Sequence, residues 1–232
     1  MLGGRSRDLV SAYDTTMYFQ DFLHPTTGVA QCVDEALEAK AADYREMKIK
    51  TGQGVHSMLA EAGMRHDAEV VLTIRDAVGP DFTLYVDANF GYDGRLDLLE
   101  EFFWETVAAN IFWFEEMVTA DVDSYRQMSD MQAKHAPDSL LTCGEVDQNP
   151  ILPVSQDLID QGLIDRYQPD LVSHGLAGWM ETERQLDHTY KPDGVTFEDG
   201  AYRVGEFTGL GLKIDQDIWI RNHAANEMTL SA

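Results

Sequence analysis

The sequence is poor in cysteine and in basic residues, and it contains no long apolar segment. Its 232 residues include two cysteines, Cys32 and Cys143, which form no CxxC pair, so neither a cysteine metal site nor a disulfide framework is expected. This cysteine usage predicts a reducing, cytoplasmic location. No apolar run reaches the roughly 18 residues of a membrane-spanning helix. The N-terminal MLGGRSRDLV lacks the apolar centre of a signal peptide.

Charge of one sign dominates the chain. Lys and Arg number 17 against 41 Asp and Glu, which gives a formal net charge of −24. Nucleic acids and anionic membranes are bound through basic patches, so neither is expected as a partner. The hydrophobic content of 44% is enough for a sizeable core. The composition therefore predicts a soluble folded protein.

Short β-rich runs alternate with segments of helical periodicity. Strands are predicted at residues 9–13, 45–50, 82–89, 111–116, 139–145 and 164–170. Helices are predicted at residues 29–42, 57–78, 95–109, 121–135, 153–162 and 177–190. Such alternation predicts a parallel sheet with right-handed crossovers, for which a doubly wound sheet and a (β/α) barrel are both possible.

Ionisable residues stand at the carboxyl ends of five predicted strands: Lys50, Asp87, Glu115, Glu145 and Asp170. In a parallel barrel all of these ends open on one face, where barrel enzymes place their active sites. In an open doubly wound sheet only a few strands meet at the switch point. The pattern therefore favours an α/β fold of the TIM-barrel type. The alternative is that each strand ends in a polar residue only because the chain emerges there into water.

Asp87, Glu115 and Glu145 follow one another at about one β/α unit each. Three hard oxygen ligands from adjacent strands suit Mg²⁺. Zinc is disfavoured because no His or Cys stands at these strand ends. The alternative is that the three carboxylates are simply solvated. The sequence therefore predicts a magnesium site built from these residues.

Lys48 and Lys50 lie two positions apart on one strand and so share a face. A lysine beside a bound dication gives up its proton more readily, because a second positive charge disfavours the ammonium form. Such a lysine can act as a general base on a proton next to a carboxylate. The metal would then stabilise the resulting enediolate. The alternative is a basic strand end on the rim.

The ordered motifs KIKTG, VDAN, WFEE, CGE and YQPD resemble the enolase superfamily, in its mandelate racemase/muconate lactonizing branch. The opening LGGRSRD and the closing GLGLKID resemble that family as well, so the similarity covers nearly the whole chain. The resemblance implies a modified TIM barrel in which Asp87, Glu115 and Glu145 bind Mg²⁺. It further implies roles for four other residues: Lys50 as the base, Lys48 in holding the carboxylate or tuning Lys50, Asn89 in substrate contact, and Asp170 in orienting a catalytic histidine.

The sequence departs from this family at three points. Met117 replaces the usual proline after the paired glutamates. The chain starts at the first barrel strand, so the N-terminal capping domain is expected to be absent. No apolar strand ending in histidine follows residues 177–190; residues 195–204 instead predict a hairpin around Asp199-Gly200. His174 is a speculative substitute for the missing histidine. We therefore expect an incomplete barrel of about six β/α units at 1–190 and a C-terminal hairpin and tail at 191–232.

These observations predict Mg²⁺-dependent removal of the proton α to a carboxylate. The expected substrate is a small-molecule sugar acid, and the expected outcome is dehydration or epimerisation. The alternative is a catalytically inactive, truncated barrel that retains metal binding. An open barrel exposes two sheet edges, which pairing with a second copy covers, so a homo-oligomer is expected.

Overall fold

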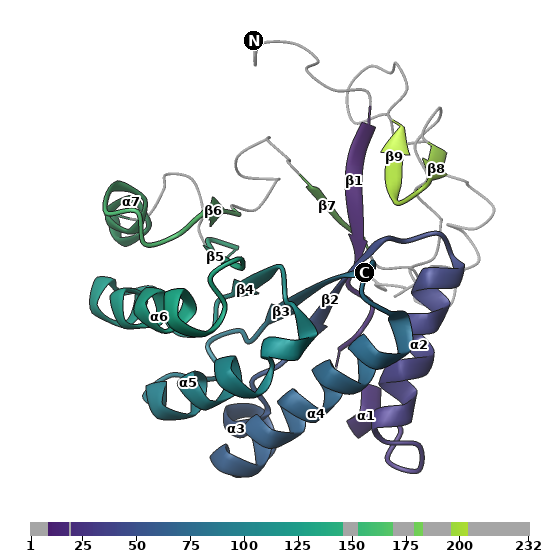
Figure 1. The fold of residues 1–232 in the computed structure, drawn as a ribbon, viewed down its shortest axis with the longest axis horizontal. Coiled ribbons are helices and arrows are strands. Elements are labelled where there is room, and N and C mark those ends of the chain that lie inside the picture. Colours follow the sequence, from purple (N-terminus) through teal and green to yellow (C-terminus); the bar gives the residue numbers. More distant parts are fainter. Residues whose placement is uncertain (1–8, 19, 146–152, 169–178, 183–195, 204–232) are drawn as a thin grey trace, which may run out of the picture.

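The computed structural model describes residues 9–18, 20–145, 153–168, 179–182 and 196–203 (Figure 1). Its helices are α1 (Gln20–Leu23), α2 (Val29–Ala41), α3 (Gln53–His56), α4 (Ala60–Val78), α5 (Leu96–Glu105), the 3₁₀ turn η1 (Val107–Ala109), α6 (Val122–His135) and α7 (Pro153–Asp160). Its strands are β1 (Leu9–Asp14), β2 (Glu46–Lys50), β3 (Thr83–Asp87), β4 (Trp113–Glu115), β5 (Leu140–Cys143), β6 (Arg166–Tyr167), β7 (Trp179–Thr182), β8 (Thr196–Glu198) and β9 (Ala201–Arg203).

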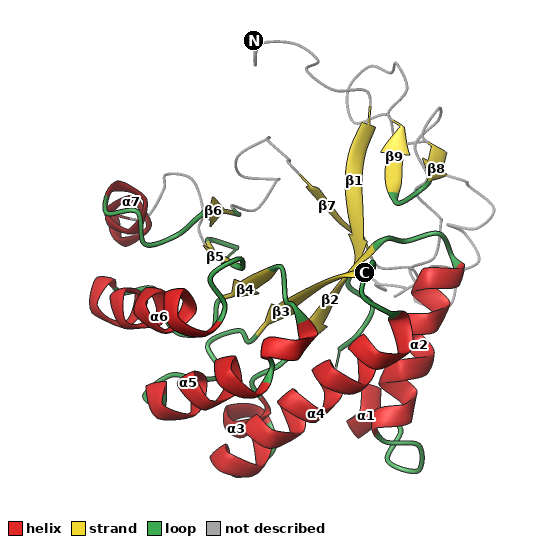
Figure 2. Cartoon of the chain, in the orientation of Figure 1, coloured by secondary structure: helices red, strands yellow, loops and turns green. Residues whose placement is uncertain are grey.

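Six parallel strands follow one another across the sheet in chain order. The order is β6-β5-β4-β3-β2-β1, and β7 pairs in parallel with β1. The helices lie along the outer side of this curved sheet (Figure 2). A doubly wound sheet reverses its strand order at a switch point and carries helices on both faces, so the topology is that of a barrel. Within the described residues no pairing joins β6 to β7, and the barrel is incomplete.

One predicted helix is wrong in its described part. Residues 179–182, inside the helix expected at 177–190, form strand β7, with Ser11 opposite Trp179 and Asp14 opposite Thr182. The alternation of Ala, Met and Leu around this segment mimics helical spacing, but the free edge of β1 offers backbone partners that outweigh local propensity. The rest of that segment, from 183 onward, lies outside the described residues.

The two faces of the sheet carry different chemistry because strand side chains alternate. On β2, Met47 and Ile49 face the helices and join the large apolar core. Lys48 and Lys50 occupy the alternate positions of β2. A small aromatic cluster of Tyr13, Tyr85 and Trp113 forms separately from the main core. The inner face is therefore where the sequence concentrates charge and aromatic rings.

The hairpin predicted near the C-terminus is confirmed. Strands β8 and β9 pair antiparallel across Asp199 and Gly200, both at positive φ, as a two-residue hairpin turn requires. Strand β9 also pairs antiparallel with β1. The division of the chain at residue 190 stays a prediction. In the part of the chain that the structure describes, no helix is both long and apolar enough to cross a membrane.

The turn after β2 requires glycine at position 52. Gly52 has φ 89°, and an added Cβ would lie 2.6 Å from the carbonyl oxygen of Ala88 and 2.9 Å from Cα of Gly91. We expect Gly52→Ala to lower the free energy of unfolding by about 1–3 kcal/mol more than Gly79→Ala, because overpacking adds to the strain of positive φ. Gly79 is the matched control, with φ 81° and open space around it. Urea unfolding of both variants measures the difference, and equal losses would contradict the close approach.

Candidate functional site

The candidate site forms where three neighbouring strands end in register. Lys50 on β2 lies opposite Asp87 on β3, and Asp87 lies opposite Glu115 on β4. One rung below, Lys48 lies opposite Tyr85, and Tyr85 opposite Trp113. Parallel pairing in this register places the charged side chains of adjacent strands on one face. The sheet itself therefore brings Lys48, Lys50, Asp87 and Glu115 together.

The three predicted metal-binding carboxylates converge. Asp87, Glu115 and Glu145 each present an oxygen within 4.8 Å of the other two. Asp87 and Glu115 are buried, whereas Glu145 is exposed beyond the end of β5. Gly144, which precedes Glu145, has φ 117°, and a Cβ added to it would lie 2.6 Å from the Tyr167 ring. The strand-end argument is thus matched by the positions of all three side chains.

Both predicted lysines lie against these carboxylates. The Lys50 ammonium donates to Asp87 Oδ2 at 2.5 Å and to Asn89 Oδ1 at 2.8 Å. The Lys48 ammonium lies 3.2 Å from Asp87 Oδ2 and 3.3 Å from Glu115 Oε1. Lys48 is 0% exposed, and Lys50 is 9% exposed. Both ammonium groups are therefore partners of the candidate ligand carboxylates.

Each buried carboxylate is also oriented by a neutral donor. The backbone N–H of Asn89 donates to Asp87 Oδ1 at 3.0 Å, and the Trp113 indole donates to Glu115 Oε2 at 3.2 Å. Hydrogen bonds of this kind fix the direction in which a ligand oxygen points. The apolar pattern of residues 111–114 indicates core alone and so misses Trp113. Its place two positions before Glu115 on the same strand is the signal that identifies it.

An aromatic layer closes the site from below. The rings of Tyr85 and Trp113 stack at 3.7 Å with an interplanar angle of 6°, and Tyr13 meets both edge-on. The Lys48 ammonium lies 5.6 Å from the Tyr13 ring centroid. Stacked rings beneath buried charges keep water away and strengthen the electrostatic interactions above them.

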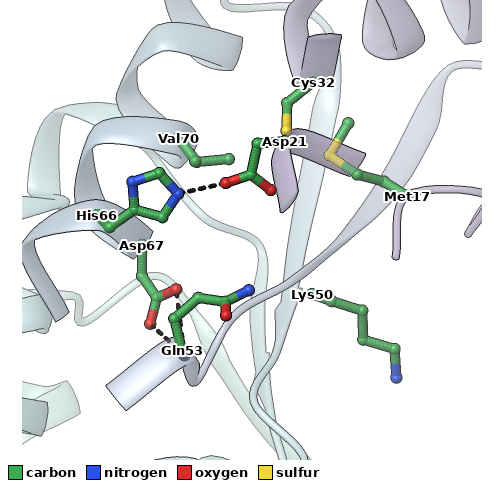
Figure 3. Close-up of a pocket in the computed structure, with 8 residues that line it drawn as sticks. All are labelled: Met17, Asp21, Cys32, Lys50, Gln53, His66, Asp67 and Val70. Carbon is green, nitrogen blue, oxygen red and sulfur yellow. Dashed lines mark hydrogen bonds and ion pairs between the residues drawn. The ribbon is translucent and has the colours of Figure 1, made fainter. Parts of the chain in front are cut away.

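A further carboxylate, which the sequence analysis missed, lies behind the site. Asp67 on α4 is 2% exposed and accepts hydrogen bonds from Gly52 N at 2.8 Å and Tyr92 Oη at 2.9 Å. Burial raises its pKa to about 7, although these hydrogen bonds oppose the shift. Figure 3 shows Asp67 above Gln53, with Lys50 extending away from it. An acidic residue on the buried face of the helix predicted at 57–78 is the signal that identifies it.

His66, next to Asp67, pairs with Asp21 of α1 across a small pocket. Its ring also meets Phe22 edge-on at 5.6 Å. Asp170 and His174, the predicted acid and its speculative substitute, lie outside the described residues.

The donor set fits a hard dication. The three carboxylate oxygens lie within 4.8 Å of one another, and hard, charged oxygen donors of this kind suit Mg²⁺. The cluster lies in the open end of the strands, as an ion that also takes substrate oxygens requires. The described residues of this cluster include no nitrogen or sulfur ligand that would favour zinc instead.

Fold and site together define a barrel protein with an acidic cluster and adjacent lysines at the carboxyl ends of its strands. Residues 31–183, more than half of the chain, match the family described as "Enolase C-terminal domain-like". The chain belongs to this family, which confirms the resemblance in the sequence. The two solved structures named below superpose on nearly the whole of this chain, which confirms the expected fold class.

Three similar proteins illustrate the relationship. D-galactarolactone cycloisomerase from Agrobacterium fabrum is 30% identical over 187 residues, which are 79% of this chain and 43% of that protein. A mutant galacturonate dehydratase from Geobacillus sp., complexed with Mg, superposes with a TM-score of 0.76 at 22% identity, over 97% of this chain and 68% of that one. The 3,6-anhydro-D-galactonate cycloisomerase from Zobellia galactanivorans gives 0.68 at 21% identity, over 95% and 68%. The chain thus spans less than half the length of its cycloisomerase relative.

Proposed function

We propose that this chain carries the site of a Mg²⁺-dependent enzyme that removes the proton α to the carboxylate of a sugar acid. The observation that supports this most is the convergence of three carboxylates on one spot, with the Lys50 ammonium on the neighbouring strand end. Asp87, Glu115 and Glu145 would hold the ion. When bound, Mg²⁺ supplies positive charge to the substrate carboxylate as that group becomes more negative.

Lys50 takes the α-proton in this proposal. Its ammonium lies at the rim of the buried cluster and is held by Asp87 and Asn89, so its nitrogen has a fixed position at the mouth. Neutral Lys50 accepts the proton and becomes an ammonium. Lys48, fully buried between Asp87 and Glu115, places a second positive charge beside these carboxylates. Asn89 contacts the substrate beside Lys50.

The step after proton removal separates dehydration from epimerisation. In dehydration, the β-hydroxyl leaves with a proton from a second acid. In epimerisation, the carbon regains a proton on its other face. Relatives include a dehydratase and cycloisomerases. Asp170 is the predicted residue of the second acid/base group. Of the two outcomes we therefore propose dehydration first, with Asp170 taking part in the loss of the β-hydroxyl.

Hydrogen–deuterium exchange tests the shared first step. The full chain with Mg²⁺ is incubated in D₂O with D-galacturonate, D-galactarolactone and tartrate, and the α-proton signal is followed by NMR. These compounds are those named for similar proteins. We expect loss of the α-proton of at least one compound, and we expect EDTA to stop it.

An inactive, metal-binding barrel is the second candidate. It is favoured by the absence of any β6–β7 pairing in the described residues, which leaves that side of the barrel open. Mg²⁺ binding measured by calorimetry, together with no exchange for any compound, would support it. No Mg²⁺ binding by the wild type would contradict both candidates. Homo-oligomer formation through the open edges stays a prediction.

A further inference from the structure

Asp67 does no chemistry in the proposed reaction, yet its carboxylate accepts from three donors in two loops of the site. Oδ2 accepts from Gly52 N at 2.8 Å, from Gln53 N at 3.3 Å and from Tyr92 Oη at 2.9 Å. Gly52 and Gln53 follow β2, whereas Tyr92 follows β3. A buried aspartate is unfavourable unless hydrogen bonds compensate for it. Here the compensating bonds join the loop behind the base to the loop that carries Asn89.

The two loops are also pressed together by their backbones. A Cβ on Gly91 would lie 2.2 Å from Cα of Gly52, and Thr51 N donates to the carbonyl oxygen of Asp87 at 2.8 Å. Gly63 of α4 approaches Gly54 equally closely, because a Cβ there would lie 2.2 Å from Gly54 N. Helix α4 therefore supports the turn from behind, and Asp67 is the hydrogen-bonding contact within that support.

The atoms held in place by this arrangement are those of the proposed base. Lys50 stands two residues before Gly52, and its nitrogen lies 2.8 Å from Asn89 Oδ1. Asn89 and Phe90 have φ of 42° and 66°, which non-glycine residues keep only where their surroundings enforce it. We therefore expect a loosened loop junction to let Lys50 move relative to Asn89.

We propose that Asp67 is a positioning residue, which fixes the nitrogen of Lys50 against Asp87 and Asn89 by tying the loops after β2 and β3 to helix α4. The catalytic part of this proposal rests on the proposed function. The positional part does not, because it concerns loop protection and the reactivity of one lysine.

The test compares Asp67→Asn with Asp76→Asn in the full chain with Mg²⁺. The Asp67→Asn substitution keeps the size of the side chain but turns one acceptor into a donor that faces other donors. Asp76 lies exposed on the same helix and controls for the change of charge. Amide hydrogen exchange at Gly52 and Gln53 reports whether these two amides remain hydrogen-bonded to residue 67. Competitive acetic anhydride labelling reports the access of Lys50, with the exposed Lys134 of α6 as an internal reference.

For Asp67→Asn we expect at least about 10-fold faster exchange at both amides and faster labelling of Lys50 alone. We expect kcat for α-proton exchange to fall about 10- to 100-fold, with KM and Mg²⁺ affinity within about 3-fold, because a misplaced base affects the chemical step. Asp76→Asn should match the wild type. Unchanged labelling of Lys50, or a thermal destabilisation with an unchanged kcat, would overturn the proposal. If the wild type itself shows no α-proton exchange, the proposed function fails, while the labelling and amide results still decide whether Asp67 positions Lys50.

Discussion

Replacing Glu115 by Gln is expected to weaken Mg²⁺ binding by at least about 100-fold. The substitution keeps the shape of the side chain and its contact with the Trp113 indole. It removes one of three negative charges at the cluster and leaves a neutral amide where the dication needs a charged oxygen. Glu115 is also a buried partner of Lys48. Without its charge, the Lys48 ammonium repels a bound dication more strongly. Calorimetric titration with MgCl₂ measures the loss.

Glu46→Gln is the matched control for this prediction. Glu46 starts the strand that Lys50 ends, and its carboxylate accepts from Tyr85 Oη at 2.6 Å, away from the cluster. It therefore changes the net charge equally without touching the candidate ligands, and Mg²⁺ affinity should stay within about 3-fold of the wild type. Glu145→Gln, at the exposed ligand, should weaken binding as well. Full Mg²⁺ affinity in Glu115→Gln would rule out this cluster as the metal site.

Much of the barrel is visible in the sequence because parallel strands buried on both faces give short, dense apolar runs between helical segments. The described strands β1 to β6 and helices α2 and α4 to α7 all match predicted ranges, with differences of up to four residues at the ends. Residues 179–182 could not be predicted in this way. Their strand conformation depends on pairing with β1, more than 160 residues earlier, and no local pattern encodes such a distant edge.

The candidate site divides in the same manner. Lys50, Asp87 and Glu115 stand at strand ends, so the period of two and the β/α repeat bring them to one rung. Asp67 and Trp113 act through hydrogen bonds to these strands and their loops, and such contacts follow from packing of a helix and a stacked ring. Residue type and spacing therefore predict the charged cluster, whereas the groups that orient it become visible only with the three-dimensional contacts.

Replacing Lys50 by Met is expected to reduce α-proton exchange by about 10³-fold or more while Mg²⁺ still binds. Methionine matches the length of the lysine stem but cannot accept a proton, and general-base catalysis contributes about 10²–10⁴-fold. Asp87 keeps Lys48 as a partner at 3.2 Å, so the buried carboxylate retains a counter-charge. Removing one ammonium from beside the carboxylates should leave Mg²⁺ affinity equal to or above that of the wild type.

Two further variants give this result its meaning. Lys40→Met removes a lysine of helix α2 whose nitrogen donates to the carbonyl oxygen of Val78 at the end of α4, and it should leave exchange unchanged. Lys50→Arg keeps the charge but not an accessible neutral form, and should be as inactive as Lys50→Met if proton transfer is the role of Lys50. Activity restored by arginine would instead assign Lys50 to charge stabilisation. Exchange in Lys50→Met at the wild-type rate would show that another group is the base. Among the described lysines, only Lys50 has its nitrogen beside Asn89 at the mouth of the cluster.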